Sequence, residues 1–153
     1  MSTTEHSAFI DAPPARVYSA LLDPTLLAQW RVPAGMRCVV HQFEPKEGGA
    51  FRISLSYDEP DVAGKTTAHT DTYRGHFEEL IPHRRVVESL EFETSDVRMQ
   101  GAMRIMTELV AEGGGTRINA VHENLPPGVS PSDNEAGWRE SLTKLSALLG
   151  PAR

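Results

Sequence analysis

The sequence has a single cysteine and no long apolar run. Cys38 has no partner for an internal disulfide and no second cysteine for a C-x-x-C metal or redox motif, which fits a reducing cytoplasm. No stretch approaches the roughly 18 apolar residues of a membrane span, and the N-terminus lacks a basic region followed by an apolar run. We therefore expect a cytoplasmic protein with no membrane span.

Positive charge is also scarce, with 15 Lys and Arg against 21 Asp and Glu and a formal net charge of -6. The basic residues are scattered along the chain, whereas nucleic-acid binding needs a concentrated basic surface. We therefore expect no nucleic-acid partner. At 153 residues, 39% hydrophobic and 24% charged, the chain fits one globular domain over residues 1–153.

Motifs for common chemistry are missing as well. No G-x-S-x-G nucleophile elbow occurs, and the glycine-rich "EGGGT" lies between two expected strands, so it predicts a hairpin turn and not a phosphate loop. The segment "HTDTYRGHF" contains His69, Asp71 and His76, but their spacing matches no known ligand set. We expect no metal site and no cofactor.

The middle of the chain shows strand-like alternation. In "FRISLSYD", Phe51, Ile53, Leu55 and Tyr57 alternate with polar residues, which predicts a strand with one buried face. Turn signals such as Gly64-Lys65 separate the strands, so the sheet should be an antiparallel meander. Further strands are expected over residues 37–45, 70–81, 85–94, 101–111 and 116–124.

Helices are expected at both ends of this sheet, which makes the fold class α+β. The segment "DAPPARVYSALLDPTLLAQW" predicts two short helices interrupted at Asp23-Pro24 and ending near Trp30. The C-terminal "AGWRESLTKLSALL" predicts a long amphipathic helix, with Ser132 or Asp133 as its cap. Its apolar stripe consists of Trp138, Leu142, Leu145 and Leu149.

Glu88 is a carboxylate on an expected apolar face, shared with Val86, Leu90 and Phe92. Burying it costs several kcal/mol unless it is paired, hydrated or protonated, so an inward Glu88 indicates a polar or water-filled interior. The alternative is a local bulge that turns Val87 inward and Glu88 outward.

His122 falls on the inward face of the last expected strand by the same rule. It is either a hydrogen-bonded core histidine or a contact for a bound molecule. One strand would separate it from Glu88, a distance of about 9.5 Å, so a ligand or water could bridge the two side chains.

A curved sheet around one long helix leaves either a packed core or a pocket. Trp30, Tyr57, Tyr73 and Trp138 could line such a pocket, although inward aromatic residues also serve as plain core. The candidate ligand-cavity residues are Trp30, Phe51, Ile53, Leu55, Tyr57, Tyr73, Glu88, Leu90, Phe92, Met103, Ile105, Thr107, His122, Trp138 and Leu142.

Several blocks of the sequence resemble one family when taken in order. They are "DAPPARVYSALLDPTLLAQW", "FEPKEGGAFRI", "YRGHFEELIPHRRVVESLEF" and "GGGTRINAVHENLP", followed by "GW" and the leucine-spaced helix. Together they cover roughly residues 6 to 149 and are similar to activator of heat-shock protein 90 ATPase homologue-like domains of the START-like, or SRPBCC, superfamily. The resemblance implies a Bet v 1-like helix-grip fold, in which a curved antiparallel sheet wraps a long C-terminal helix, commonly with a cavity for apolar molecules. Members of the family more usually have an apolar or aromatic residue at the position of Glu88.

Three functions follow from these observations, and the first is preferred. It is a binding module for a small, mostly apolar molecule held between the sheet and the C-terminal helix. The second is a cyclase- or dehydratase-type enzyme using Glu88 or His122 for proton transfer in the same cavity. The third is a chaperone-associated interaction domain, which is less favoured because the eukaryotic co-chaperone has an additional N-terminal domain. The sequence leaves ligand identity and homodimerisation open.

Overall fold

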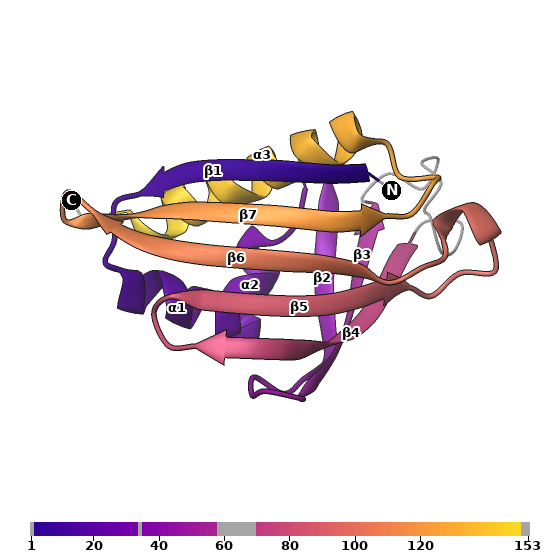
Figure 1. The fold of residues 1–153 in the computed structure, drawn as a ribbon, viewed down its shortest axis with the longest axis horizontal. Helices are drawn as coiled ribbons and strands as arrows, with labels where there is room; N and C mark the ends of the chain where they lie inside the picture. The colour runs from indigo at the N-terminus through magenta and orange to yellow at the C-terminus, as the bar shows by residue number, and fades with distance from the viewer. Residues whose placement is uncertain (1, 34, 58–69, 151–153) are drawn as a thin grey trace.

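In the residues that the structure describes, the fold consists of seven strands and three α-helices (Figure 1). The protein is described by a computed structural model that covers residues 2–33, 35–57 and 70–150; the predicted turn at Gly64-Lys65 and His69 lie outside these ranges. In chain order the elements are β1 (Ser2–Ile10), α1 (Pro14–Leu22), α2 (Pro24–Trp30), β2 (Met36–Phe43), β3 (Ala50–Tyr57), β4 (Thr70–Ile81), β5 (Arg85–Phe92), a 3-10 turn (Val97–Met99), β6 (Met103–Glu112), β7 (Gly115–Leu125) and α3 (Pro131–Leu149).

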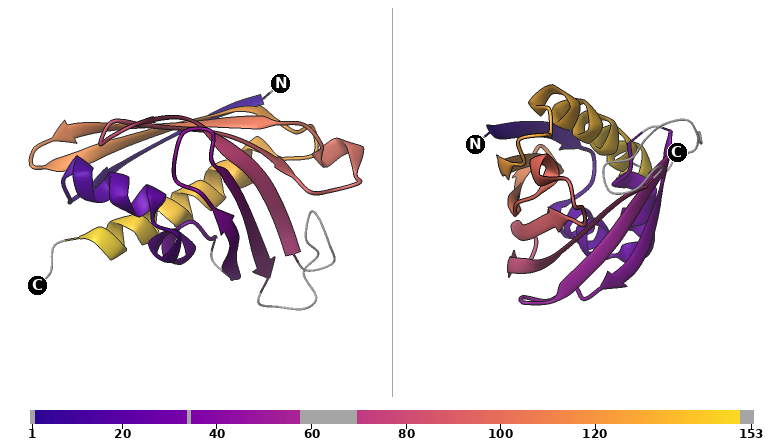
Figure 2. Two further views of the ribbon diagram at one scale, coloured as in Figure 1. Left: turned by 90° about the horizontal axis from the view of Figure 1, so that it is seen from below. Right: turned by 90° about the vertical axis from the view of Figure 1, so that its right-hand side faces the viewer.

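All seven strands belong to one antiparallel sheet, in the order β1-β7-β6-β5-β4-β3-β2. The predicted meander from the strand near residue 37 to the strand near residue 124 is confirmed, as is the α+β class. The strand β1 was not predicted; it lies beside β7, with Ile10 opposite Thr116. Figure 2 shows that the sheet curls around the helices, so that α3 crosses its concave side and β2 to β4 form a second wall.

The helix ends follow local hydrogen-bonding rules. Asp23 caps α2, its carboxylate accepting from the backbone N–H groups of Thr25 and Leu26 at 2.9 and 3.3 Å. The prediction that Ser132 or Asp133 caps the last helix is wrong. The helix begins earlier, at Pro131, because proline is favoured in the first turn and the Ser130 hydroxyl accepts from the Asp133 N–H at 3.4 Å. None of the described helices is long and apolar enough to cross a membrane.

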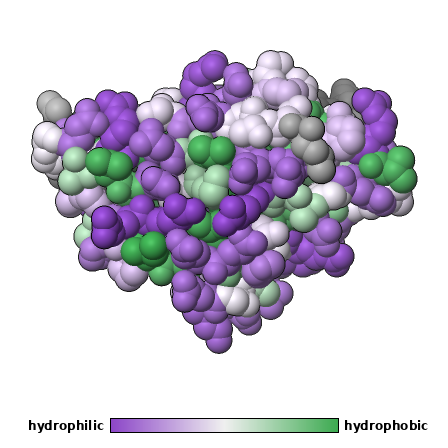
Figure 3. Space-filling view, viewed as in Figure 1, coloured by the Kyte–Doolittle hydropathy of each residue, from purple (hydrophilic) through white to green (hydrophobic). Residues whose placement is uncertain are grey.

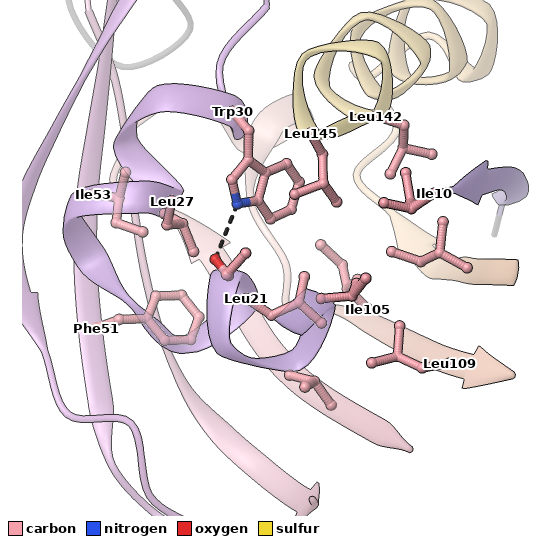
Figure 4. Close-up of a cluster of buried hydrophobic side chains, with 14 of the residues drawn as sticks. Ile10, Leu21, Leu27, Trp30, Phe51, Ile53, Ile105, Leu109, Leu142 and Leu145 are labelled. Carbon is pink, nitrogen blue, oxygen red and sulfur yellow. Dashed lines mark hydrogen bonds between the residues drawn. The ribbon is translucent and has the colours of Figure 1, made fainter. Parts of the chain in front are cut away.

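The core fills the space between α1, α2, the second half of α3 and the sheet (Figure 4). Trp30 at the end of α2 is fully buried, and its indole N–H donates to the Ala20 carbonyl at 3.0 Å. Leu145 of α3 packs in the same cluster. Because this end of the molecule is filled, open space between α3 and the concave side of β3 to β6 lies toward the start of α3.

The convex face of the sheet is covered by arginine and glutamate side chains, and the view of this face in Figure 3 is predominantly hydrophilic. Arg74–Glu91, Arg85–Glu108 and Arg104–Glu123 join neighbouring strands, whereas Arg104–Glu78 spans from β6 to β4 and Arg52–Glu93 joins β3 to the residue after β5. Water screens such exposed pairs, so they contribute little to stability individually. They do keep the convex face of the sheet polar. The candidate site described below lies on the concave face.

Candidate functional site

A pocket of about 520 Å³ lies between the first half of α3 and the concave side of the sheet. This volume is within the range of about 300–1,000 Å³ typical of small-molecule sites. Trp138 of α3 forms part of its wall, as do residues of β3 to β6. Of the predicted cavity residues, those that line this pocket are Leu55, Tyr57, Tyr73, Leu90, Phe92, Met103, Ile105 and Trp138.

The other predicted cavity residues lie elsewhere. Trp30, Phe51, Ile53 and Leu142 belong to the packed core, where α1 and α2 fill the space that a larger cavity would need (Figure 4). Thr107 is also buried outside the pocket lining. Glu88 and His122 are buried behind the wall, at 4% and 0% exposure, and reach the pocket only through their neighbours.

Glu88 points to the concave side, as the alternation predicted. The irregularity in this pair of strands falls between Phe77 and Glu79 on β4, so β5 keeps its register. Phe77, Glu88, Ile105 and His122 therefore form one row across β4, β5, β6 and β7. The alternative of an outward Glu88 is excluded by this pairing and by its burial.

Arg31 is the partner of Glu88, and sequence reasoning missed it. Its Nη1 donates to Glu88 Oε1 at 2.7 Å, and both side chains are almost completely buried. The guanidinium also lies over two aromatic rings, 5.7 Å from the Tyr73 centroid and 5.4 Å from that of Trp138. Arg31 lines the pocket, so a neutralised ion pair forms part of the pocket wall.

Burial and this ion pair set the protonation states at the wall. Burial works to lower the pKa of Arg31, but the Glu88 carboxylate outweighs it, and the net pKa lies above the ordinary value. Burial raises the pKa of Tyr73 to about 12, against an opposing effect of Arg31. Tyr73 is thus a neutral hydroxyl at physiological pH, while Arg31 keeps its charge.

Trp138 contacts His122 as well as Arg31. The ring centroid of His122 is 4.5 Å from that of Trp138, edge to face, and 4.5 Å from that of His6 on β1. Neither ring nitrogen of His122 has a hydrogen-bond partner among the residues that the structure describes. Burial, with smaller contributions from His6 and Arg31, lowers the pKa of His122 to about 2 against an opposing effect of the nearby Asn134 side chain, so the ring is neutral.

Thr4, His6 and Asn134 form a short series of polar contacts beside His122, and we call this region the His6–His122 corner. The Thr4 hydroxyl donates to Asn134 Oδ1 at 2.6 Å and lies 3.0 Å from His6 Nε2. Because the hydroxyl has one proton and gives it to Asn134, His6 must donate from Nε2. Burial lowers the pKa of His6, which fits this neutral tautomer. The residues that hold the corner together thus come from both ends of the chain.

A second hollow, of about 590 Å³, lies between β1 and α3. Its lining includes the charged side chains of Glu5, Glu135 and Arg139, and Leu142 is the predicted cavity residue that reaches it. Phe9 and His6 are the aromatic side chains in its described lining, against Tyr57, Tyr73, Phe92 and Trp138 in the first pocket. Within the described residues, no group of three or more His, Cys, Asp or Glu side chains is arranged to hold a metal ion.

Comparisons with known proteins agree with this architecture. A crystal structure of a protein from Chromobacterium violaceum matches with a TM-score of 0.88 at 29% identity, covering 98% of each chain. A protein from Rhodobacter sphaeroides matches with a TM-score of 0.80 at 22% identity, covering 97% of this chain and 91% of the other. The AHSA1 protein from Silicibacter pomeroyi matches with a TM-score of 0.79 at 19% identity, covering 97% of each chain.

No curated protein sequence matches this chain. The family model for "Activator of Hsp90 ATPase homolog 1-like protein" matches residues 11–150, from the residue after β1 to the end of α3. The chain therefore belongs to the activator of Hsp90 ATPase homolog 1-like family, with the helix-grip fold that its sequence blocks indicate.

Proposed function

We propose that this protein is a binding module for a small, mostly apolar molecule, held in the pocket between α3 and the sheet. The observation that carries the proposal is the character of the pocket lining. Apolar side chains such as Leu55, Leu90 and Met103 stand beside four aromatic rings. Apolar walls with a few placed polar groups are typical of small-molecule sites.

The buried ion pair supports binding more than catalysis. Glu88 would be the natural acid or base of an enzyme in this cavity, but its carboxylate is held by Arg31 at 2.7 Å. No carboxylate or carbonyl in the described chain accepts a hydrogen bond from the neutral His122 ring, so it lacks the orienting group that a general base uses. The arrangement therefore favours recognition of a ligand over proton transfer.

Membership of the family and the helix-grip fold support a ligand-binding or chaperone-associated domain in general. Within that range we favour ligand binding, because the pocket offers a specific place for it. The family name mentions the activation of an ATPase, so the alternative is a chaperone-associated interaction domain. The lone Cys38, half-buried on β2, fits a cytoplasmic location.

The test is binding of the neutral fluorescent probe N-phenyl-1-naphthylamine to the purified protein. We expect saturable binding with a rise in melting temperature, since a ligand that binds only the folded state stabilises it. Leu55→Trp fills the pocket from β3 and should abolish binding. Val39→Trp is the matched control on the neighbouring strand β2, because Val39 is 50% exposed and lies outside the pocket lining.

Equal probe affinity in the wild type and in folded Leu55→Trp would overturn the proposal. Native mass spectrometry of freshly purified protein adds a second test. An added mass that is lost in Leu55→Trp and kept in Val39→Trp would support the pocket as the binding site and give the mass of the natural ligand.

A further inference from the structure

His122 is the least satisfied polar group near the pocket. A neutral imidazole has one N–H donor and one nitrogen acceptor, and both lie fully buried here without a partner in the described chain. An unmade hydrogen bond in a buried place is costly, so such a group calls for a specific reason. A phenylalanine would fill the same space without that cost.

The neighbours of His122 belong to the pocket wall. Ile105 lies beside it across the β6–β7 pair, and Trp138 packs its edge against the ring. Both line the pocket, as does Asn134 one turn before Trp138 on α3. His122 is thus one side chain away from the pocket space.

Trp138 contacts His122 edge to face and also lines the pocket. Its ring is half-buried and contacts other rings and Arg31, but no hydrogen bond to its indole N–H occurs within the described residues. Trp30, by contrast, is fully buried and anchored to the Ala20 carbonyl. A rotation of the Trp138 side chain would give pocket contents access to His122.

The charges nearby disfavour an anionic ligand group, because Asp71, Asp133 and Glu140 also line the pocket. Arg31 is the one cation in the described pocket lining, and Glu88 already neutralises it. His122 itself is uncharged at physiological pH because of its burial, so it would not pair with a carboxylate. A neutral hydroxyl, however, can accept from its N–H or donate to its bare nitrogen, and a neutral carbonyl can accept from its N–H.

We propose that His122 is the hydrogen-bonding anchor for a neutral hydroxyl- or carbonyl-bearing aromatic ligand, whose polar end reaches it when the Trp138 side chain moves aside. The aromatic body of the ligand would lie among Tyr57, Tyr73 and Phe92. This inference rests on the proposed function. It adds the class of molecule and the residue that forms a hydrogen bond with the polar end of that molecule.

The test compares three bicyclic compounds as competitors of N-phenyl-1-naphthylamine: naphthalene, 2-naphthol and 2-naphthoate. On the wild-type protein, 2-naphthol should bind roughly 3- to 10-fold more tightly than naphthalene, as one net hydrogen bond would give. It should also bind more tightly than 2-naphthoate. The His122→Phe variant should keep the naphthalene affinity and lose the preference for 2-naphthol. The control variant Thr107→Val should keep the preference for 2-naphthol, because Thr107 is buried on β6 outside the pocket lining.

Nuclear magnetic resonance of the His122 ring nitrogens gives a readout on the unaltered protein. Adding 2-naphthol should shift these resonances, whereas naphthalene should leave them in place. A preference for 2-naphthol that survives in His122→Phe, ring-nitrogen resonances that do not respond, or tightest binding of 2-naphthoate would overturn the anchor while the pocket proposal stands. Failure of the fluorescent probe itself to bind would overturn the proposed function, and with it the anchor.

Discussion

Replacing Arg31 by methionine would leave Glu88 as an unpaired carboxylate in the interior. Two unit charges about 4 Å apart attract by about 4 kcal/mol at an effective dielectric constant of about 20. The Arg31–Glu88 contact is 2.7 Å with side-chain exposures of 10% and 6%, so screening by water is slight. Removing one partner of such a pair typically costs about 3–5 kcal/mol. For a protein of this size we expect a fall of roughly 6–20 °C in melting temperature.

The assay is thermal and urea unfolding followed by circular dichroism, on single and double variants. The double variant Arg31→Met, Glu88→Leu should recover most of the loss, because two apolar side chains replace a buried ion pair at little cost. Arg52→Met is the matched control: Arg52 makes two hydrogen bonds to Glu93 at 2.7 and 2.9 Å, but on the exposed outer face. Its unfolding midpoint should barely change, since water screens that pair.

A double variant that is as unstable as Arg31→Met alone would contradict the prediction that an unpaired Glu88 carboxylate causes the loss of stability. That result would mean that the loss comes from the packing of the guanidinium against Tyr73 and Trp138, and not from an uncompensated charge. An Arg52→Met variant that loses as much stability as Arg31→Met would equally contradict the assignment, because burial would then not matter.

Three further predictions concern single side chains. The folded pKa of His122 is about 2, below the ordinary 6.5, so its contribution to stability is present above pH 6.5 and is lost as the pH falls toward 2. His122→Phe should therefore reduce the loss of unfolding free energy between pH 6.5 and 5 by about 2 kcal/mol in urea titrations, with exposed His76→Phe as control. Gly75→Ala should lower the unfolding free energy by about 2–4 kcal/mol in the same assay, because a Cβ there would meet the backbone carbonyl of Ser89. Trp138→Ala should speed the modification of His122 by diethylpyrocarbonate, followed by mass spectrometry; an unchanged rate would mean that Trp138 does not shield the ring.

Periodicity was enough to predict most of the sheet. The alternation through Phe51 and Tyr57, and through Val86 and Leu90, follows directly from one face being buried, so these strands and their order were confirmed. The strand Ser2–Ile10 was missed because its inward side carries Thr4 and His6, which give no apolar alternation. Residues Ser2–Ile10 form a strand because they pair with β7, which lies far away in the sequence.

The candidate site was predictable only in part. Glu88 and His122 could be placed on the inward face, because register fixes which way a strand residue points. Arg31 could not be placed in this way, because it follows the end of α2 and the apolar periodicity of a helix does not extend beyond its last residue. The signal that could have found it was the carboxylate itself: an inward Glu88 needs a nearby cation, and Arg31 follows the buried Trp30.

The pairing of β1 with β7 and α3 has a consequence for the synthesis of the chain. Thr4 bonds to Asn134, and Arg16 donates to the Leu149 carbonyl at 3.0 Å, so residues before α2 are held by residues of α3. During translation β1 leaves the ribosome well before its partner β7, which follows only after more than a hundred further residues. Until then its edge is open to pairing with other chains, and contacts so distant in sequence form slowly. The His6–His122 corner should therefore be the last part of the molecule to assemble.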